Sequence, residues 1–224
     1  MERGIDYTPK RVHPPKGANF IGIQDKTLHP NQFSAMVKNV VGNVLSASDQ
    51  DFEDGKLWYP KGQGIATEIG GGNLEKGAGI IAAVSPGTGW NENVRMATEI
   101  GRTGDTKGYI TGAEKGRAQK IREGADPRTV LPMDIKTGHF FRNLVNPRDP
   151  SAVTIDRHAH DAAIGQRWGS RDRGLRGGRY QTFANAHFTA TQHLNRISGL
   201  EDLVPSEVQA ISWLHHRRKL GIVD

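Results

Sequence analysis

The apolar run at residues 79–86 (GIIAAVSP) constrains the fold of this chain more than any other feature. Its length and its lack of alternation fit either a buried strand or a buried helix. A buried strand needs a partner, and no second run with strand-like alternation of apolar and polar residues occurs in the sequence. The run therefore predicts a buried helix, and we expect a mainly α-helical chain with little or no sheet.

Apolar residues also recur at three-and-four spacing between Phe33 and Val44, which predicts an amphipathic helix. This helix is expected to run from an N-cap at Asn31 to about Ser48. The whole sequence predicts about eight to ten short helices. Other helices are expected at residues 90–100, 113–123, 138–144, 180–194 and from 205 onward.

The segment between residues 49 and 72 is expected to be interrupted. Its acidic residues 49–54 predict a loop, and residues 65–69 predict a short helix. The three consecutive glycines at residues 70–72 should end that helix, because glycine destabilises helix interiors.

A chain of 224 residues is long enough for one domain with a sizeable core. Hydrophobic residues make up only 35%, and there are 28 glycines and 11 prolines, so generous loops should surround a compact centre. Residues 1–30 carry four prolines among scattered charges and show no periodicity. We expect an extended or partly disordered arm at residues 1–30 and a single helical domain at residues 31–224.

The net charge of +6 and the pI near 9.6 indicate a polyanionic partner, most simply nucleic acid. The alternative is a basic protein that binds nothing anionic. The absence of cysteine excludes disulfides, a cysteine nucleophile and iron–sulfur clusters, and no cofactor is expected. No apolar run approaches the roughly 20 residues that cross a bilayer, and the N-terminus lacks a signal-peptide pattern. We expect a soluble cytoplasmic protein with no membrane contact and no obligate protein partner.

Arginines are concentrated in residues 166–179, among glycines and beside Trp168. This segment cannot bury much apolar surface, so we expect an exposed loop that contacts phosphates while Trp168 stacks on a base. A disordered solubilising loop is the alternative. The residues predicted to contact DNA are Arg157, Arg167, Trp168, Arg171, Arg173, Arg176, Arg179, Arg217 and Arg218.

Residues 130–163 combine a lysine in a tight turn with an aspartate that opens a helix. Residues 131–137 (LPMDIKT) are expected to form the turn, with Lys136 as either a nucleophilic amine or a phosphate ligand. Asp156 is either a catalytic carboxylate or an ordinary N-cap. His158 either orients Asp156, contacts phosphate or lies at the surface. His158 and His160 are two residues apart and cannot share a helical face, so no metal site is expected.

Three segments carry a resemblance. Residues 80–86 (IIAAVSP) precede Trp90, Asn91 and Asn93, as an apolar helix followed by an asparagine-bearing helix. Residues 131–137 look like a Leu-Pro-Gly-Val-Gly-x-Lys-Thr hairpin shortened by one residue, and residues 153–158 (VTIDRH) look like a Val-Asp-Thr-His segment. In this order they resemble the helix-hairpin-helix DNA glycosylase superfamily, which includes endonuclease III. The similarity spans roughly residues 79–163.

The resemblance implies a two-lobed helical fold in which a base is rotated out of duplex DNA into a pocket between the lobes. The implied activity is N-glycosidic bond cleavage on double-stranded DNA. Asp156 is then expected to stabilise cationic sugar character or to activate the nucleophile, and Lys136 to attack the sugar C1′. The residues implied to line the substrate pocket are Trp90, Asn91, Asn93 and His158.

The hairpin departs from the family pattern, because Met133, Asp134 and Ile135 replace glycines that let backbone amides approach a phosphate. Asp134 beside a phosphate would be repulsive. Two alternatives therefore stay open. One is a resemblance to phage-encoded hypermodification enzymes, acting in the host cytoplasm, in which an amine reacts at an activated 5-hydroxymethyl group of uracil in DNA without cleavage of the glycosidic bond. The other is a DNA-binding protein without catalytic activity.

Overall fold

The computed structural model describes residues 30–108, 110–167, 175 and 177–222. Within these residues it contains ten α-helices and no strand, which confirms the mainly α fold and the helix predicted for the apolar run. All but the last residue of the arm predicted at residues 1–30 lies outside this part. The helices are α1 (Pro30–Leu45), α2 (Asp49–Ile69), α3 (Leu74–Ala83), α4 (Trp90–Thr103), α5 (Gly112–Arg122), α6 (Pro127–Val130), α7 (Lys136–Val145), α8 (Arg157–Ile164), α9 (Gly177–Leu194) and α10 (Pro205–Lys219).

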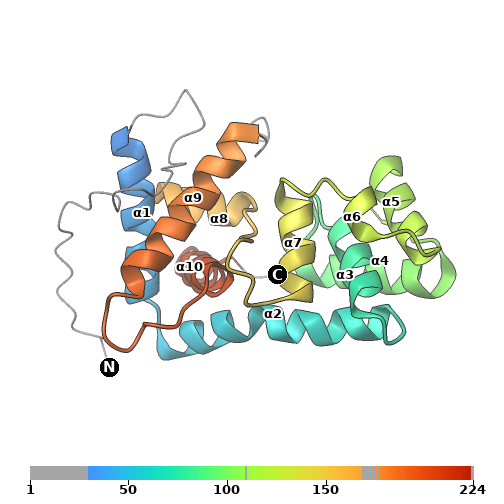
Figure 1. Cartoon of the computed structure of the whole chain (residues 1–224), viewed down its shortest axis with the longest axis horizontal. Helices are drawn as coiled ribbons and strands as arrows, with labels where there is room; N and C mark the ends of the chain where they lie inside the picture. The colour runs from blue at the N-terminus through green and yellow to red at the C-terminus, as the bar shows by residue number, and fades with distance from the viewer. Residues whose placement is uncertain (1–29, 109, 168–174, 176, 223–224) are drawn as a thin grey trace.

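The long helix α2 runs along two groups of helices and joins them (Figure 1). One group contains α1, α8, α9 and α10, and the other contains α3 to α7. Each group encloses its own cluster of buried apolar side chains, the first including Val40 and Ile211 and the second including Ile80 and Phe141. The partly buried Trp58 of α2 packs against both clusters, so it lies where the two groups meet.

The acidic loop predicted at residues 49–54 is wrong, because these residues form the first turns of α2. Ser48 caps the helix by accepting the Asp51 N–H at 3.1 Å, and the Asp51 carboxylate accepts the Ser48 N–H at 3.4 Å. The buried Asp51 also forms an ion pair with Arg218 of α10, which lies 2.6 Å from Asp54 as well. Two of the carboxylates that suggested a loop, those of Asp51 and Asp54, therefore form ion pairs with a residue from the other end of the chain.

Two smaller predictions have different outcomes. Asn31 lies inside α1 rather than at its N-cap, because Pro30 already occupies the first helical position. The stop at the three glycines is confirmed, since α2 ends at Ile69 and α3 begins at Leu74.

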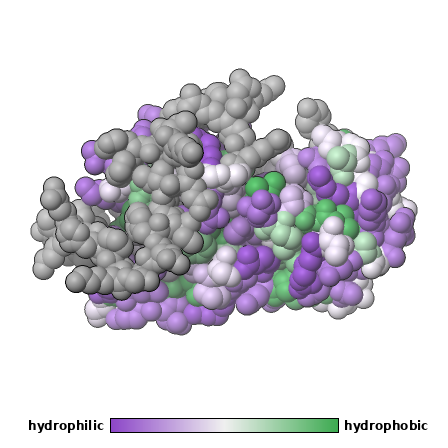
Figure 2. Space-filling model, turned by 45° about the horizontal axis from the view of Figure 1, so that its top comes forward, coloured by the Kyte–Doolittle hydropathy of each residue, from purple (hydrophilic) through white to green (hydrophobic). Residues whose placement is uncertain are grey.

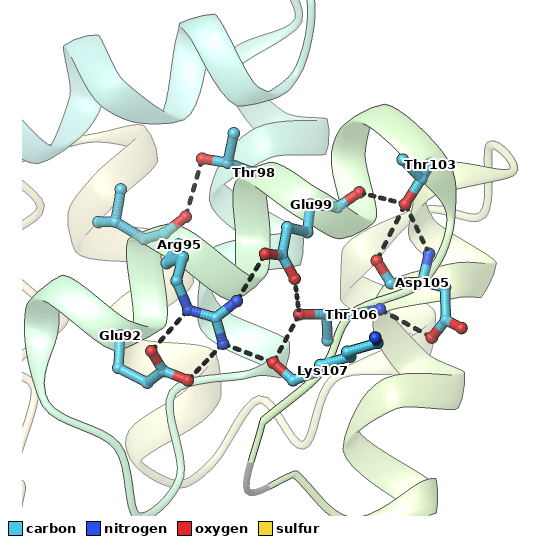
Figure 3. Close-up of polar contacts among 9 residues, drawn as sticks. Glu92, Arg95, Thr98, Glu99, Thr103, Asp105, Thr106 and Lys107 are labelled. Carbon is cyan, nitrogen blue, oxygen red and sulfur yellow. Dashed lines mark hydrogen bonds and ion pairs between the residues drawn. The ribbon is translucent and has the colours of Figure 1, made fainter.

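Hydrogen bonds and ion pairs connect α4 with Thr106 and Lys107 in the loop that follows it (Figure 3). Arg95 donates to Glu92 and Glu99 at 2.5–2.7 Å and to the Lys107 carbonyl at 2.5 Å. Thr106 donates to the other carboxylate oxygen of Glu99 at 2.5 Å. Single surface ion pairs contribute little to stability, but this shared guanidinium connects two turns of α4 with the loop.

The surface in Figure 2 is largely hydrophilic over the described residues, with smaller hydrophobic areas between the polar ones. Among the helices of the described part, none combines the length and the apolar character that crossing a membrane requires.

Candidate functional site

Lys136 is the first residue of α7 and follows the turn at residues 131–135, so the predicted turn was two residues too long. Gly138 lets this turn lie directly on α7. A β-carbon at Gly138 would overlap the Cα of Met133 and lie 2.6 Å from its carbonyl carbon. The Gly138 N–H donates to the Pro132 carbonyl at 3.2 Å. These contacts fix the direction in which α7 presents Lys136.

The ammonium group of Lys136 is surrounded by protein, although the residue as a whole keeps some accessible surface. Its Nζ donates to the backbone carbonyl of Ser85, just beyond α3, at 2.9 Å. Burial lowers the pKa of Lys136, and the charges of Asp156 and Glu114 act in the opposite direction. A lysine with a lowered pKa holds more of the neutral amine, which is the nucleophilic form.

Asp156 occupies the N-cap of α8, in agreement with one of the two roles that the sequence suggested. Its Oδ1 accepts the Ala159 N–H at 2.7 Å, which is the capping hydrogen bond. Its Oδ2 accepts the indole N–H of Trp213 from α10 at 3.2 Å. Both oxygens of the half-buried carboxylate therefore have a donor, and the second donor lies outside the cap.

The segment at residues 152–155, here termed the strap, is buried and leads directly into Asp156. The Val153 N–H donates to Nδ1 of His139 in α7 at 3.1 Å. The Tyr180 hydroxyl of α9 donates to the Val153 carbonyl at 2.9 Å and accepts the Ile155 N–H at 3.1 Å. Side chains from both helical groups thus hold the strap and set the position of Asp156.

Three tryptophans from different helices lie where the two helical groups meet. The ring centroid of Trp58 is 5.5 Å from that of Trp90 and 5.1 Å from that of Trp213. Trp90 also packs edge-on against Phe140 at 6.3 Å. The sequence singled out Trp90 as a pocket residue but neither Trp58 nor Trp213.

A family model with the description "Family of unknown function (DUF7178)" matches residues 23–220, which include Lys136, Asp156 and the three tryptophans. The chain belongs to the DUF7178 family. No curated protein and no solved structure is significantly similar to the chain.

In this DUF7178 protein the predicted pocket residues differ in their placement. Asn91 is exposed on α4, whereas Asn93 is buried and its Oδ1 has no hydrogen-bond partner among the described residues. His158 is half-buried and meets the Trp213 ring edge-on at 6.4 Å. Burial lowers the pKa of His158. The side chain that donates a hydrogen bond to Asp156 is Trp213, whereas the sequence suggested His158 as the residue that orients Asp156.

The predicted DNA-contacting segment at residues 166–179 is only partly described. Arg157 and Arg167 are exposed. Arg179 belongs to α9, which begins at Gly177, so the expected loop ends earlier than predicted. The predicted residues that lie outside the described part are Trp168, Arg171, Arg173 and Arg176.

The two arginines predicted near the end of α10 both contact other side chains. Arg218 pairs with Asp51 and Asp54. Arg217 is buried, and its guanidinium carbon lies 4.4 Å from the centroid of the Trp213 ring. In the described part of this DUF7178 protein, no group of three His, Cys, Asp or Glu residues could hold a metal ion.

Proposed function

We propose that this protein is a DNA glycosylase-like enzyme that binds double-stranded DNA, flips out a base and acts on it where the two helical groups meet. The observation that carries the proposal is geometric: His139 of α7, the helix that Lys136 opens, holds the strap that leads into Asp156 at the start of α8. The order of elements supports it, because α6, the turn and α7 have the order of a helix, a hairpin and a helix. In this proposal the two helical groups are the two lobes of a glycosylase-like fold.

The two side chains have different roles in the proposed reaction. The Asp156 carboxylate stabilises positive charge on the sugar as the bond between C1′ and the base breaks. Water then forms the new bond to C1′, and the departing base takes up a proton. In the lyase variant, the neutral amine of Lys136 attacks C1′ instead of water as the base leaves, and opening of the bond between C1′ and the ring oxygen then gives a Schiff base. The Lys136 amine first has to leave the Ser85 carbonyl that it contacts.

Charge supports DNA as the partner. The net charge is +6, and the exposed Arg157 directly follows Asp156, at the start of α8. A cation in this position suits a phosphate next to the reacting nucleotide.

The test is incubation with duplexes that contain uracil, thymine mismatches, oxidised bases or 5-hydroxymethyluracil, followed by detection of abasic sites. We expect product from one class, and a rate about 10²–10³ lower in Asp156→Asn, since losing one electrostatic stabiliser typically has this effect. The matched control is Asp126→Asn, because Asp126 is also a helix N-cap, that of α6. Equal losses in both variants would assign Asp156 to capping alone.

Borohydride trapping tests the lyase variant separately. Reduction of a Schiff base should link the wild-type protein to DNA covalently, and Lys136→Ala should lose this adduct. Lys120→Ala is the matched control, because Lys120 is an exposed lysine on α5. An adduct of full strength in Lys136→Ala would remove Lys136 from the nucleophilic role.

The exposed Asp134 at the turn favours a second candidate, because it puts a negative charge where the glycines of the helix-hairpin-helix glycosylases approach a phosphate. This candidate is a transferase acting on activated 5-hydroxymethyluracil in DNA: the amine nitrogen bonds to the 5-methylene carbon and loses a proton, while the C–O bond breaks and pyrophosphate leaves. Mass spectrometry of nucleosides from pyrophosphorylated hydroxymethyl-DNA incubated with amino acids should then show an adduct. DNA binding without product in either assay would leave the non-catalytic DNA-binding protein.

A further inference from the structure

We propose that Trp213 is a positioning residue that holds the Asp156 carboxylate in its working orientation, with Arg217 strengthening the indole as a donor. The catalytic consequence rests on the proposed function. The contact itself is testable without any substrate.

The two hydrogen bonds on Asp156 do different things. The bond from the Ala159 N–H to Oδ1 is the one that any aspartate N-cap makes, and it leaves the second oxygen unconstrained. The bond from Trp213 fixes Oδ2 from another helix, α10. An indole N–H only donates, so this bond cannot reverse its direction. With one donor on each oxygen, the plane of the carboxylate is set.

Trp213 is itself well fixed. It is 8% exposed, and its ring is enclosed by Trp58 at 5.1 Å and by the edge of His158 at 6.4 Å. Arg217 lies over the ring at 4.4 Å. A cation over the face of an indole withdraws electron density from the ring, so its N–H becomes a stronger donor to a carboxylate. The charges of Arg217 and Asp156 are therefore linked through one aromatic ring.

Nuclear magnetic resonance of ¹⁵N-labelled protein tests the contact directly. The indole N–H signal of Trp213, assigned through its own backbone resonances, should lie downfield and exchange slowly with water. Asp156→Ala should move this signal upfield and speed its exchange, and Asp156→Asn, which keeps an acceptor, should have a smaller effect. The Trp90 indole signal serves as the internal control. A Trp213 signal that does not respond to Asp156→Ala would overturn the proposal.

Kinetics test the positioning role. Trp213→Phe keeps an aromatic ring and removes the donor. We expect kcat to fall by about tenfold to hundredfold with KM unchanged, because this is the usual effect of losing a hydrogen bond to a charged group. Arg217→Gln should lower kcat less. Unchanged kcat in a folded Trp213→Phe variant would overturn the proposal.

The two proposals fail in different ways. A wild-type protein without activity on every duplex would contradict the proposed function, and the indole signal would then decide whether Trp213 holds Asp156. An active wild-type protein with an indole signal that ignores Asp156 would contradict the positioning role alone.

Discussion

Gly77→Ala should destabilise the protein by about 3 kcal/mol or more, the upper end of what overpacking in a core produces. Gly77 lies in α3 where this helix crosses α2, and its added β-carbon would overlap the carbonyl oxygen of Ala66 and lie 2.7 Å from its carbonyl carbon. A β-carbon has no rotamer that could avoid backbone atoms. The two helices would have to separate, which opens the buried cluster of the second helical group.

Thermal and urea unfolding followed by circular dichroism measure this effect. A loss of about 3 kcal/mol corresponds to a fall in Tm of roughly 6–12 °C for a chain of this size. Gly64→Ala is the matched control, because Gly64 lies on the exposed side of α2 with no atom within 4 Å of an added β-carbon. That variant should gain up to about 1 kcal/mol from helix propensity. A similar Tm in both variants would show that α3 can move away from α2 at little cost.

The predictable parts of the fold are those set by neighbours in the sequence. The stop at residues 70–72 and the aspartate N-cap of α8 follow from residues within one or two turns, and the helix at the apolar run follows from the lack of a strand-like partner elsewhere in the sequence. The start of α2 has a local signal in the reciprocal capping bonds of Ser48 and Asp51, but the ion pairs of Arg218 with two of its carboxylates do not, because Arg218 lies at the other end of the sequence. Local charge density therefore suggested a loop where tertiary pairing allows a helix.

The same distinction applies to the site. Lys136 was singled out in a tight turn and Asp156 at the start of a helix, whereas the link from α7 to the strap that leads into Asp156 is a tertiary contact of His139. Trp213 has no local signal for its bond to Asp156, since the two residues are far apart in sequence. Tertiary contacts of this kind connect residues whose spacing carries no periodicity.

Acid should unfold the protein in two pH ranges, and the first depends on buried histidines. Burial lowers the pKa of His139 from 6.5 to about 4 and that of His187 from 6.5 to about 4. His187 donates from Nδ1 to the Phe183 carbonyl at 2.9 Å, and its buried Nε2 has no partner among the described residues. A second proton is therefore unfavourable on both rings. On His139 it would add to Nδ1, which already accepts the Val153 N–H, and on His187 it would add to the buried Nε2.

The direction in which the free energy of unfolding changes with pH depends on which state, folded or unfolded, binds more protons. Between pH 6.5 and about 4, the unfolded chain protonates these histidines while the folded protein does not, so the free energy of unfolding falls as the pH falls. Above pH 6.5 the free energy of unfolding is not reduced by these histidines. By pH 4 each of them lowers it by on the order of 3 kcal/mol. Burial lowers the pKa values of His158, His193 and His216 as well, which adds to the same trend.

A second range lies at lower pH. The pKa values of Asp51 and Asp149 are below the usual 3.8, since hydrogen bonds from Arg218 and Ser151 respectively, among others, outweigh the effect of burial. Their stabilisation is present above pH 3.8 and is lost as the pH falls through their lowered values. Loss of stability between pH 6.5 and about 5 therefore belongs to the histidines, because the glutamates whose pKa values are lowered from 4.5 contribute only at lower pH. These glutamates are Glu75, Glu92, Glu99 and Glu201.

The slope of the unfolding free energy against pH, from urea titrations between pH 7.5 and 4, measures this proton uptake. His139→Gln keeps a side-chain acceptor for the Val153 N–H. Near pH 5, it should lower the number of protons taken up on unfolding, as given by the slope, by about one. His187→Gln should remove another, and the double variant both. An unchanged slope in His139→Gln would mean that this ring is protonated in the folded protein.

Because His139 holds the strap, acid that charges its ring should also displace Asp156. If Asp156 acts at the proposed site, binding of DNA substrate should oppose this loss of stability in acid.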